Sequence, residues 1–180
     1  MKIGIDISQI VHEGTGVATY VKQIVAALVK KYPQHEYVLF GSSLRKQKVL
    51  RAYFNDIYHL SKHTRVVVLP IPPTFLEILW NRLHIFPVEW FTGPLDLFWS
   101  SDWTQPPLLR ARGVTTIHDL SILQFPNESN ETIVATQKRK LRLSARICSA
   151  FFCDSEVTKK DAEELLNIDN AKLTVVYPGL

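Results

Sequence analysis

A histidine and an aspartate stand together at the end of an apolar run, where a strand would release them into a loop. The run Val114–Ile117 is followed directly by His118 and Asp119. An imidazole titrates near neutral pH and can donate to a hydroxyl or a phosphate. The neighbouring carboxylate can orient the imidazole or bind a substrate hydroxyl. A structural role for both residues, capping a loop, is the alternative, but the place at a strand end favours catalysis.

Two glycines precede the first amphipathic segment of the chain. Gly14 and Gly16 flank Thr15, and Tyr20 follows four residues after Gly16. Glycines let backbone N–H groups approach a ligand closely, and the positive end of a helix starting here favours phosphate or carboxylate. A tight turn with Thr15 as N-cap explains the same residues without a ligand.

Two further strand ends carry polar residues. Ser100 closes the run Asp96–Ser100, and Ser155 and Glu156 follow the run Ala150–Asp154. A serine N-cap with glutamate in the first turn is ordinary helix initiation, and a ligand contact from the same residues is compatible with it. We therefore predict that Ser100, Ser155 and Glu156 lie at the rim of a cleft.

The glycine loop lacks the features of the common nucleotide-binding motifs. A dinucleotide fingerprint needs a third glycine where Thr19 stands and an acidic residue where the chain has Phe40–Ser42. The lysine that ends a P-loop is also missing. No metal site is expected, because no His, Cys and carboxylate set has zinc spacing. An NAD-dependent oxidoreductase is thus a remote alternative.

Apolar runs with β-forming residues alternate with helical patterns along the whole chain. Most of the runs are apolar on both faces, as buried parallel strands are. The alternation predicts an α/β fold, a Rossmann-like, doubly wound, mostly parallel sheet with helices on both faces, whose ligands bind beyond the carboxyl ends of the strands. Strands are expected at Lys2–Ser8, Tyr37–Gly41, Arg65–Leu69, Asp96–Ser100, Val114–His118, Ala150–Asp154 and Lys172–Tyr177; helices are expected from about Val17 to Leu28, from Glu131 to Ile147 and from Ser155 or Thr158 to Leu166.

The composition limits which classes of binding partner and which cellular compartment are expected. A length of 180 residues with 46% hydrophobic content fits one compact domain, and a formal net charge of +4 permits anionic partners. No nucleic-acid motif accompanies the charge, so nucleic acid is not an expected partner. Cys148 and Cys153 read as two reduced thiols. With no signal peptide and no apolar stretch long enough to span a bilayer, a cytoplasmic location is expected.

Aromatic and basic segments leave a peripheral membrane contact open. Between Thr74 and Trp103 the chain carries eight aromatic residues, whose main use is internal packing, although some can line an acceptor site or touch a membrane interface. Basic residues gather at Arg45–Arg51 and at Lys138–Arg146. A solvated helix face explains both clusters, and contact with anionic lipid is the second interpretation.

Taken in order, four segments resemble the N-terminal domain of the family 4 retaining glycosyltransferases, GT-B enzymes of the mannosyltransferase and glycogen-synthase-like group. Together they cover nearly the whole chain. The segments are Ile3–Asp6 with Gly14–Gly16 and Tyr20, Thr116–Leu120 with Pro126, Asp154–Lys159, and Val175–Leu180.

The resemblance implies an activity and residue roles. In that family, two Rossmann-like domains face across a cleft, with the nucleotide-sugar held mainly by the C-terminal domain and the acceptor by the N-terminal one. Gly14 and Gly16 would border the donor diphosphate, and His118 would lie near the transferred sugar; Asp119 and Glu156 follow less directly. The implied donor is a nucleotide-sugar, GDP-mannose being plausible, and the acceptor a saccharide or lipid-linked glycan. Transfer would retain the anomeric configuration without a metal or cofactor.

The resemblance also implies a domain organisation. Residues 1–176 would form the acceptor-side domain, and 177–180 would begin a linker to a donor-binding domain that is absent here. The family usually has Pro-Asn-Gly where this chain has Tyr177-Pro178-Gly179. The chain alone is then expected to be inactive. A stand-alone, non-catalytic Rossmann-like binding module is the alternative.

Overall fold

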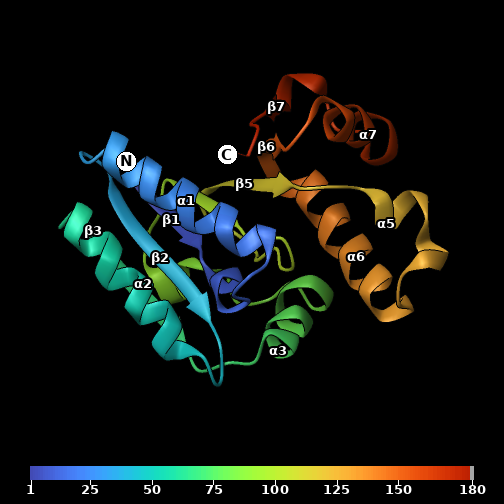
Figure 1. The fold of residues 1–180 in the computed structure, drawn as a ribbon. Coiled ribbons are helices and arrows are strands. Elements are labelled where there is room, and N and C mark those ends of the chain that lie inside the picture. The colour runs from blue at the N-terminus through green and yellow to red at the C-terminus, as the bar shows by residue number, and fades with distance from the viewer. Residues whose placement is uncertain (179–180) are drawn as a thin grey trace.

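The computed structural model describes residues 1–178 and contains one seven-stranded parallel sheet (Figure 1). Its strand order is β3-β2-β1-β4-β5-β6-β7. The Rossmann-like α/β prediction is confirmed, and each strand lies in a segment where one was expected. Gly179 and Leu180, the end of the expected linker, lie outside the described residues. The strands are β1 Lys2–Asp6, β2 Glu36–Ser42, β3 Thr64–Leu69, β4 Leu97–Ser100, β5 Arg112–Ile117, β6 Cys148–Cys153 and β7 Leu173–Val175.

The three helices expected from apolar spacing are present. The helix α6 has the expected bounds, and the capping residues Thr15, Asn130 and Ser155 accept backbone N–H groups at the starts of α1, α6 and α7. The helices are α1 Gly16–Lys31, α2 Gln47–Leu60, α3 Pro73–Glu77, α4 Glu89–Thr92, α5 Ser121–Gln124, α6 Glu131–Ile147 and α7 Glu156–Leu166; η1 Ser8–Val11, η3 Pro126–Glu128 and η4 Asn170–Lys172 are 3₁₀ turns, and η2 Ile78–Arg82 is a π-helical turn.

Helices cover both faces of the sheet because successive side chains of a strand point to opposite faces. In β2, Tyr37 and Leu39 pack in one core cluster with α1 and α2, whereas Val38 and Phe40 pack in another with α3 and η2. A third cluster joins Phe151 and Cys153 of β6 to Leu141 of α6. The sheet is therefore buried from both sides, as its apolar strands require.

The chain after β3 departs most from a regular helix. The apolar segment around Phe75–Phe86 forms α3, passes into the wider turn η2 and then leaves helical geometry. Trp80 anchors it, because its ring is fully buried beside Phe40, at 5.4 Å between centroids. Among the described residues, no helix is both long and apolar enough to cross a membrane.

Candidate functional site

The sheet order brings together the strand ends that the sequence singled out. The strand β1 lies between β2 and β4, so the direction in which strands are added reverses there. Ligands of open α/β sheets bind beyond the carboxyl ends of the strands at such a switch point. Here those ends border a cavity of about 20 Å³, which is room for one water molecule or one hydroxyl group. Lining it are Ile5, Asp6, Val17, Tyr20, Val21, Trp99, Ser100, Ser101, Asp102, Thr116 and His118.

His118 lines this cavity and is held by a carboxylate from the next strand. Its Nδ1 lies 2.7 Å from Oδ2 of Asp154, which follows β6. An ionised carboxylate can only accept a hydrogen bond, so Nδ1 is the donor to Asp154. In a neutral ring, Nε2 is then left as a hydrogen-bond acceptor. The His118 side chain is 15% exposed and that of Asp154 is 21% exposed, so the pair is partly shielded from water.

The suggestion that Asp119 orients the imidazole is wrong. Asp119 is exposed, and its Oδ1 accepts from the backbone N and the hydroxyl of Ser121, at 3.1 Å and 2.6 Å. It therefore fixes the loop before α5 through Ser121, which is a structural role of the kind considered above. Neighbouring side chains leave an extended chain in opposite directions, so the partner of His118 comes from another strand.

Aromatic rings from two elements form the walls of the cavity. The ring of Tyr20, on α1, meets the His118 ring edge-on with 5.1 Å between centroids. Trp99 meets Tyr20 in the same way at 6.3 Å, and its Nε1 donates to the hydroxyl of Thr116. The predicted residues Tyr20 and His118 are thus in contact, although 98 positions separate them in the sequence.

Asp6, at the end of β1, is a cavity residue that the sequence reading left without a role. The residue is 3% exposed; Oδ1 accepts from the backbone N of Ser8, and the buried Oδ2 has no hydrogen-bond partner within residues 1–178. Burial raises the pKa of this carboxyl above its ordinary value, although the nearby polar groups of Ser8 and Ser101 oppose the shift. The buried hydroxyl of Tyr20 also lacks a hydrogen-bond partner in the described part of the chain. Two unsatisfied polar residues therefore line a hydroxyl-sized space.

The glycine loop is open on its outer side. Gly14 has a φ of +83°, which a residue with a side chain rarely adopts, and no atom lies within 4 Å of a Cβ built on either Gly14 or Gly16. Thr15 caps α1 by accepting from the N–H of Ala18 at 3.2 Å. No acidic residue occupies the first turn of α1, and the nearest preceding carboxylate is that of the exposed Glu13, directly before the loop. The loop can therefore admit an anion.

The other predicted rim residues have internal partners. Ser100 ends β4, but its buried hydroxyl donates to Gln105 at 2.7 Å on the α6 side of the sheet. Ser155 caps α7 by accepting from the N–H of Thr158, and Glu156 is exposed in the first turn of that helix. Neither Ser155 nor Glu156 is among the residues that line the cavity.

A fully buried lysine of α6 donates a hydrogen bond to β5. Lys140 Nζ donates to the Thr115 hydroxyl at 2.8 Å, and its side chain is completely buried. Burial lowers the pKa of Lys140 below its ordinary value, while the negative charge of Asp102 acts in the opposite direction. Asp102 lines the cavity, so Lys140 lies close enough to interact with a charged residue of the site.

The substitution Lys140→Met is expected to stabilise the fold by about 1–3 kcal/mol at neutral pH, because it removes a charge whose burial is poorly compensated. Consider pH values between the lowered pKa of Lys140 in the folded protein and its ordinary pKa of 10.5 in the unfolded chain. In this range Lys140 is protonated in the unfolded chain but not in the folded one. Wild-type stability should therefore rise with pH in that window, and the advantage of the variant should shrink. Urea unfolding at pH 7 and about pH 10 measures this.

The matched control is Lys48→Met, which removes an exposed lysine of α2. It should change the unfolding free energy by less than about 0.5 kcal/mol at either pH. A Lys140→Met protein that is less stable than wild type at both pH values would contradict the interpretation of Lys140 as a strained buried charge.

A larger hollow lies away from these strand ends. Its volume is about 540 Å³, and it carries part of the basic cluster Lys138–Arg146 between α6 and α7. None of the predicted catalytic or loop residues lines it, so we assign the chemistry to the smaller cavity. Within residues 1–178, no three His, Cys, Asp or Glu side chains gather as a metal site would require.

A parallel sheet of this order, with a cavity lined by His118 and Asp6 at its switch point, defines a Rossmann-like α/β domain of the kind found in GT-B enzymes. The family model for Glycosyltransferase Family 4 matches residues 14–180, and the chain belongs to this family. No curated protein matches the chain. Family membership supports a role in glycosyl transfer.

Proposed function

We propose that this chain is the acceptor-side domain of a retaining glycosyltransferase that moves a sugar from a nucleotide-sugar to a saccharide or lipid-linked glycan. The observation that carries the proposal is the hydroxyl-sized cavity at the switch point, where His118, Asp6 and Tyr20 meet. Sugars present hydroxyl groups that both donate and accept. An imidazole acceptor beside a carboxyl and a phenol suits one such group.

In the proposed reaction, His118 binds a hydroxyl of the transferred sugar through Nε2. The hydrogen bond to Asp154 fixes the ring, so the sugar meets an acceptor that is already oriented. Asp6 and the Tyr20 hydroxyl offer the remaining hydrogen bonds. The anomeric carbon is thereby held in a defined orientation while its bond to the diphosphate oxygen breaks, a bond to the acceptor oxygen forms, and the acceptor proton passes to the leaving diphosphate.

The glycine loop would stabilise the leaving diphosphate. Negative charge grows on that group as the sugar departs, and backbone N–H groups at the start of α1 can meet it without the clash that a side chain would cause. Further positive charge would come from a second, donor-binding domain that closes over the cleft. Retention, a metal-free reaction and GDP-mannose as donor are parts of the proposal that rest on resemblance to the family.

The proposal predicts that the 180-residue chain transfers no sugar alone, whereas the same chain joined to a donor-binding domain does. Incubation with radiolabelled nucleotide-sugars, GDP-mannose first, and a membrane extract as acceptor source measures the transfer. Inactivity of a folded and assembled enzyme with every donor would contradict the proposal. If the chain still bound free saccharides, that result would favour the alternative of a non-catalytic binding module.

A further inference from the structure

Large apolar side chains are exposed together on the segment between β3 and β4. Trp90 is 64% exposed and Leu83 is 57% exposed, against at most a few per cent for the core residues Trp80 and Leu76 of the same segment. The Phe86 and Trp90 rings contact each other edge-on at 5.8 Å. The group, called here the apolar surface, consists of Phe75, Ile78, Leu83, Ile85, Phe86, Trp90 and the adjacent Leu109.

The backbone of the loop that carries these side chains adopts unfavourable φ angles. His84 and Phe86 have φ angles of +50° and +62°, a region that residues other than glycine rarely adopt. Trp80 stabilises the loop, because its Nε1 donates to the carbonyl of Phe86 at 3.0 Å, and its own carbonyl lies 3.0 Å from Nδ1 of His84. Such conformations persist where the surrounding structure imposes them, and they cluster at functional sites.

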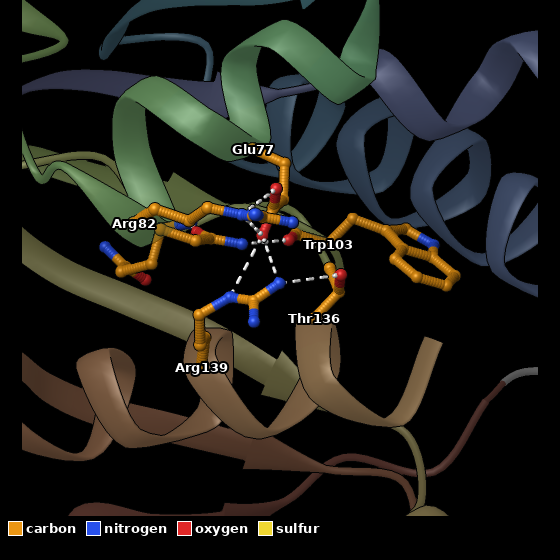
Figure 2. A network of polar contacts seen from close by, with 7 residues as sticks. Glu77, Arg82, Trp103, Thr136 and Arg139 are labelled. Carbon is orange, nitrogen blue, oxygen red and sulfur yellow. Dashed lines mark hydrogen bonds and ion pairs between the residues drawn. The ribbon is translucent and has the colours of Figure 1, made fainter. Parts of the chain in front are cut away.

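The acidic side chains of the segment that bears the apolar surface are buried. Glu77 and Glu89 are the only acidic residues between positions 57 and 95, and both are buried. Glu77 accepts from Arg82 of η2 and from Arg139 of α6, whose guanidinium groups point at the same carboxylate in Figure 2. Glu89 accepts three backbone N–H groups, those of residues 109–111, through Oε1. Neither carboxylate is available to repel an anion.

Positive charge remains exposed at the edge of the apolar surface. The Arg82 side chain is 51% exposed even though it pairs with Glu77. Arg110 is exposed next to Leu109, and Arg65 is exposed beside α4, where its guanidinium donates to the carbonyl of Thr92. In the part of the chain that the structure describes, neither Arg65 nor Arg110 forms an ion pair. The exposed edge is therefore basic.

We propose that the apolar surface docks the protein onto the interface of an anionic lipid bilayer. Tryptophan, phenylalanine and leucine side chains enter the boundary between headgroups and acyl chains, and arginines bind the anionic headgroups around them. A patch of this kind, free of exposed carboxylates, matches that environment in both polarity and charge. The inference stands apart from glycosyl transfer, because docking needs neither donor nor acceptor.

Hydrogen bonds join the segment that bears the apolar surface to a loop of the candidate site. The amide of Asn81, in η2, donates to the carbonyl of Trp103 at 2.8 Å and accepts from the backbone N of Gln105 at 2.9 Å. Both partners belong to the loop after β4, which also carries the cavity residue Asp102. Docking would therefore hold the cavity at a fixed position relative to the bilayer, which suits an acceptor that is anchored in lipid.

Co-sedimentation with vesicles tests the proposal. The chain should bind vesicles that contain about one-third phosphatidylglycerol more tightly than vesicles of phosphatidylcholine alone, and binding should weaken in about 0.5 M salt. Leu83→Ser and Trp90→Ser should each reduce partitioning about tenfold. Leu60→Ser, which alters a leucine of 46% exposure on α2, is the matched control and should bind as wild type does. Circular dichroism and thermal unfolding should show all variants folded.

Three outcomes would overturn the proposal. They are no binding to either vesicle, equal binding to neutral and anionic vesicles, and variants of the apolar surface that bind as tightly as wild type does. If sedimentation velocity instead showed a dimer that Leu83→Ser dissociates, the surface would be an interface between copies of this chain. Loss of vesicle binding with intact transfer to a soluble acceptor would separate this inference from the proposed function.

Discussion

Replacing His118 with asparagine in the complete enzyme is expected to lower kcat/KM for glycosyl transfer about 10²- to 10³-fold. The imidazole lines the cavity and is oriented by Asp154, so its loss removes a preorganised hydrogen bond to the sugar. If that bond strengthens as the anomeric bond breaks, kcat should fall more than the affinity for the nucleotide-sugar. Initial rates with labelled donor measure the first quantity, and calorimetric titration measures the second.

The control for this substitution is His59→Asn, which changes an exposed histidine of α2. Its kinetics should equal those of the wild type. If a folded His118→Asn enzyme kept its activity within about threefold, a difference of less than 1 kcal/mol, the cavity would not hold the transferred sugar.

Asp154→Asn is expected to lower kcat/KM about 10- to 10²-fold, because Asp154 positions His118 and does not itself line the cavity. The carboxylate fixes the proton on Nδ1 and leaves Nε2 as the acceptor; an amide can present its NH₂ group and reverse that arrangement. The ¹⁵N shifts of the His118 ring should report Nδ1–H in the wild type and a mixture, or the other tautomer, in the variant. A purely structural role would not move this signal.

Asp56→Asn, an exposed change on α2, serves as the control for charge removal and should affect neither rate nor tautomer. Asp154→Glu should restore part of the activity, since it returns a carboxylate to the ring. The positioning role of Asp154 would be refuted if Asp154→Asn left both the ring tautomer and the transfer rate unchanged.

The sheet could be predicted from sequence because local signals agreed with tertiary packing. Runs such as Val114–Ile117 place an apolar residue on each face, and the structure buries them on both faces. The helix α6 was predicted with its observed bounds because its apolar spacing is regular, and in the structure Asn130 caps its start. The chain at 78–86 could not be predicted, since its π-helical turn and positive φ angles depend on the buried ring of Trp80, a tertiary contact.

The candidate site was only partly accessible from sequence. His118 and Tyr20 were named, and the structure places them in contact, but the partner of His118 was sought at the adjacent Asp119. Asp154 lies 36 positions away, and only the pairing of β5 with β6 brings it near. A local signal did exist, because Asp6 and Asp154 both occur at strand ends, as His118 does. Whether the oxygen of Asp6 would find a partner depends on packing, which sequence does not reveal.

The most direct test is a crystal structure of the complete enzyme with an unreacted nucleotide-sugar bound. We expect a sugar hydroxyl within about 3 Å of Nε2 of His118, in the space between Asp6 and Tyr20, and the diphosphate beside the backbone of residues 14–16. A sugar bound away from the carboxyl edge of β1, β4 and β5, with the cavity holding only water, would contradict the assignment of this site.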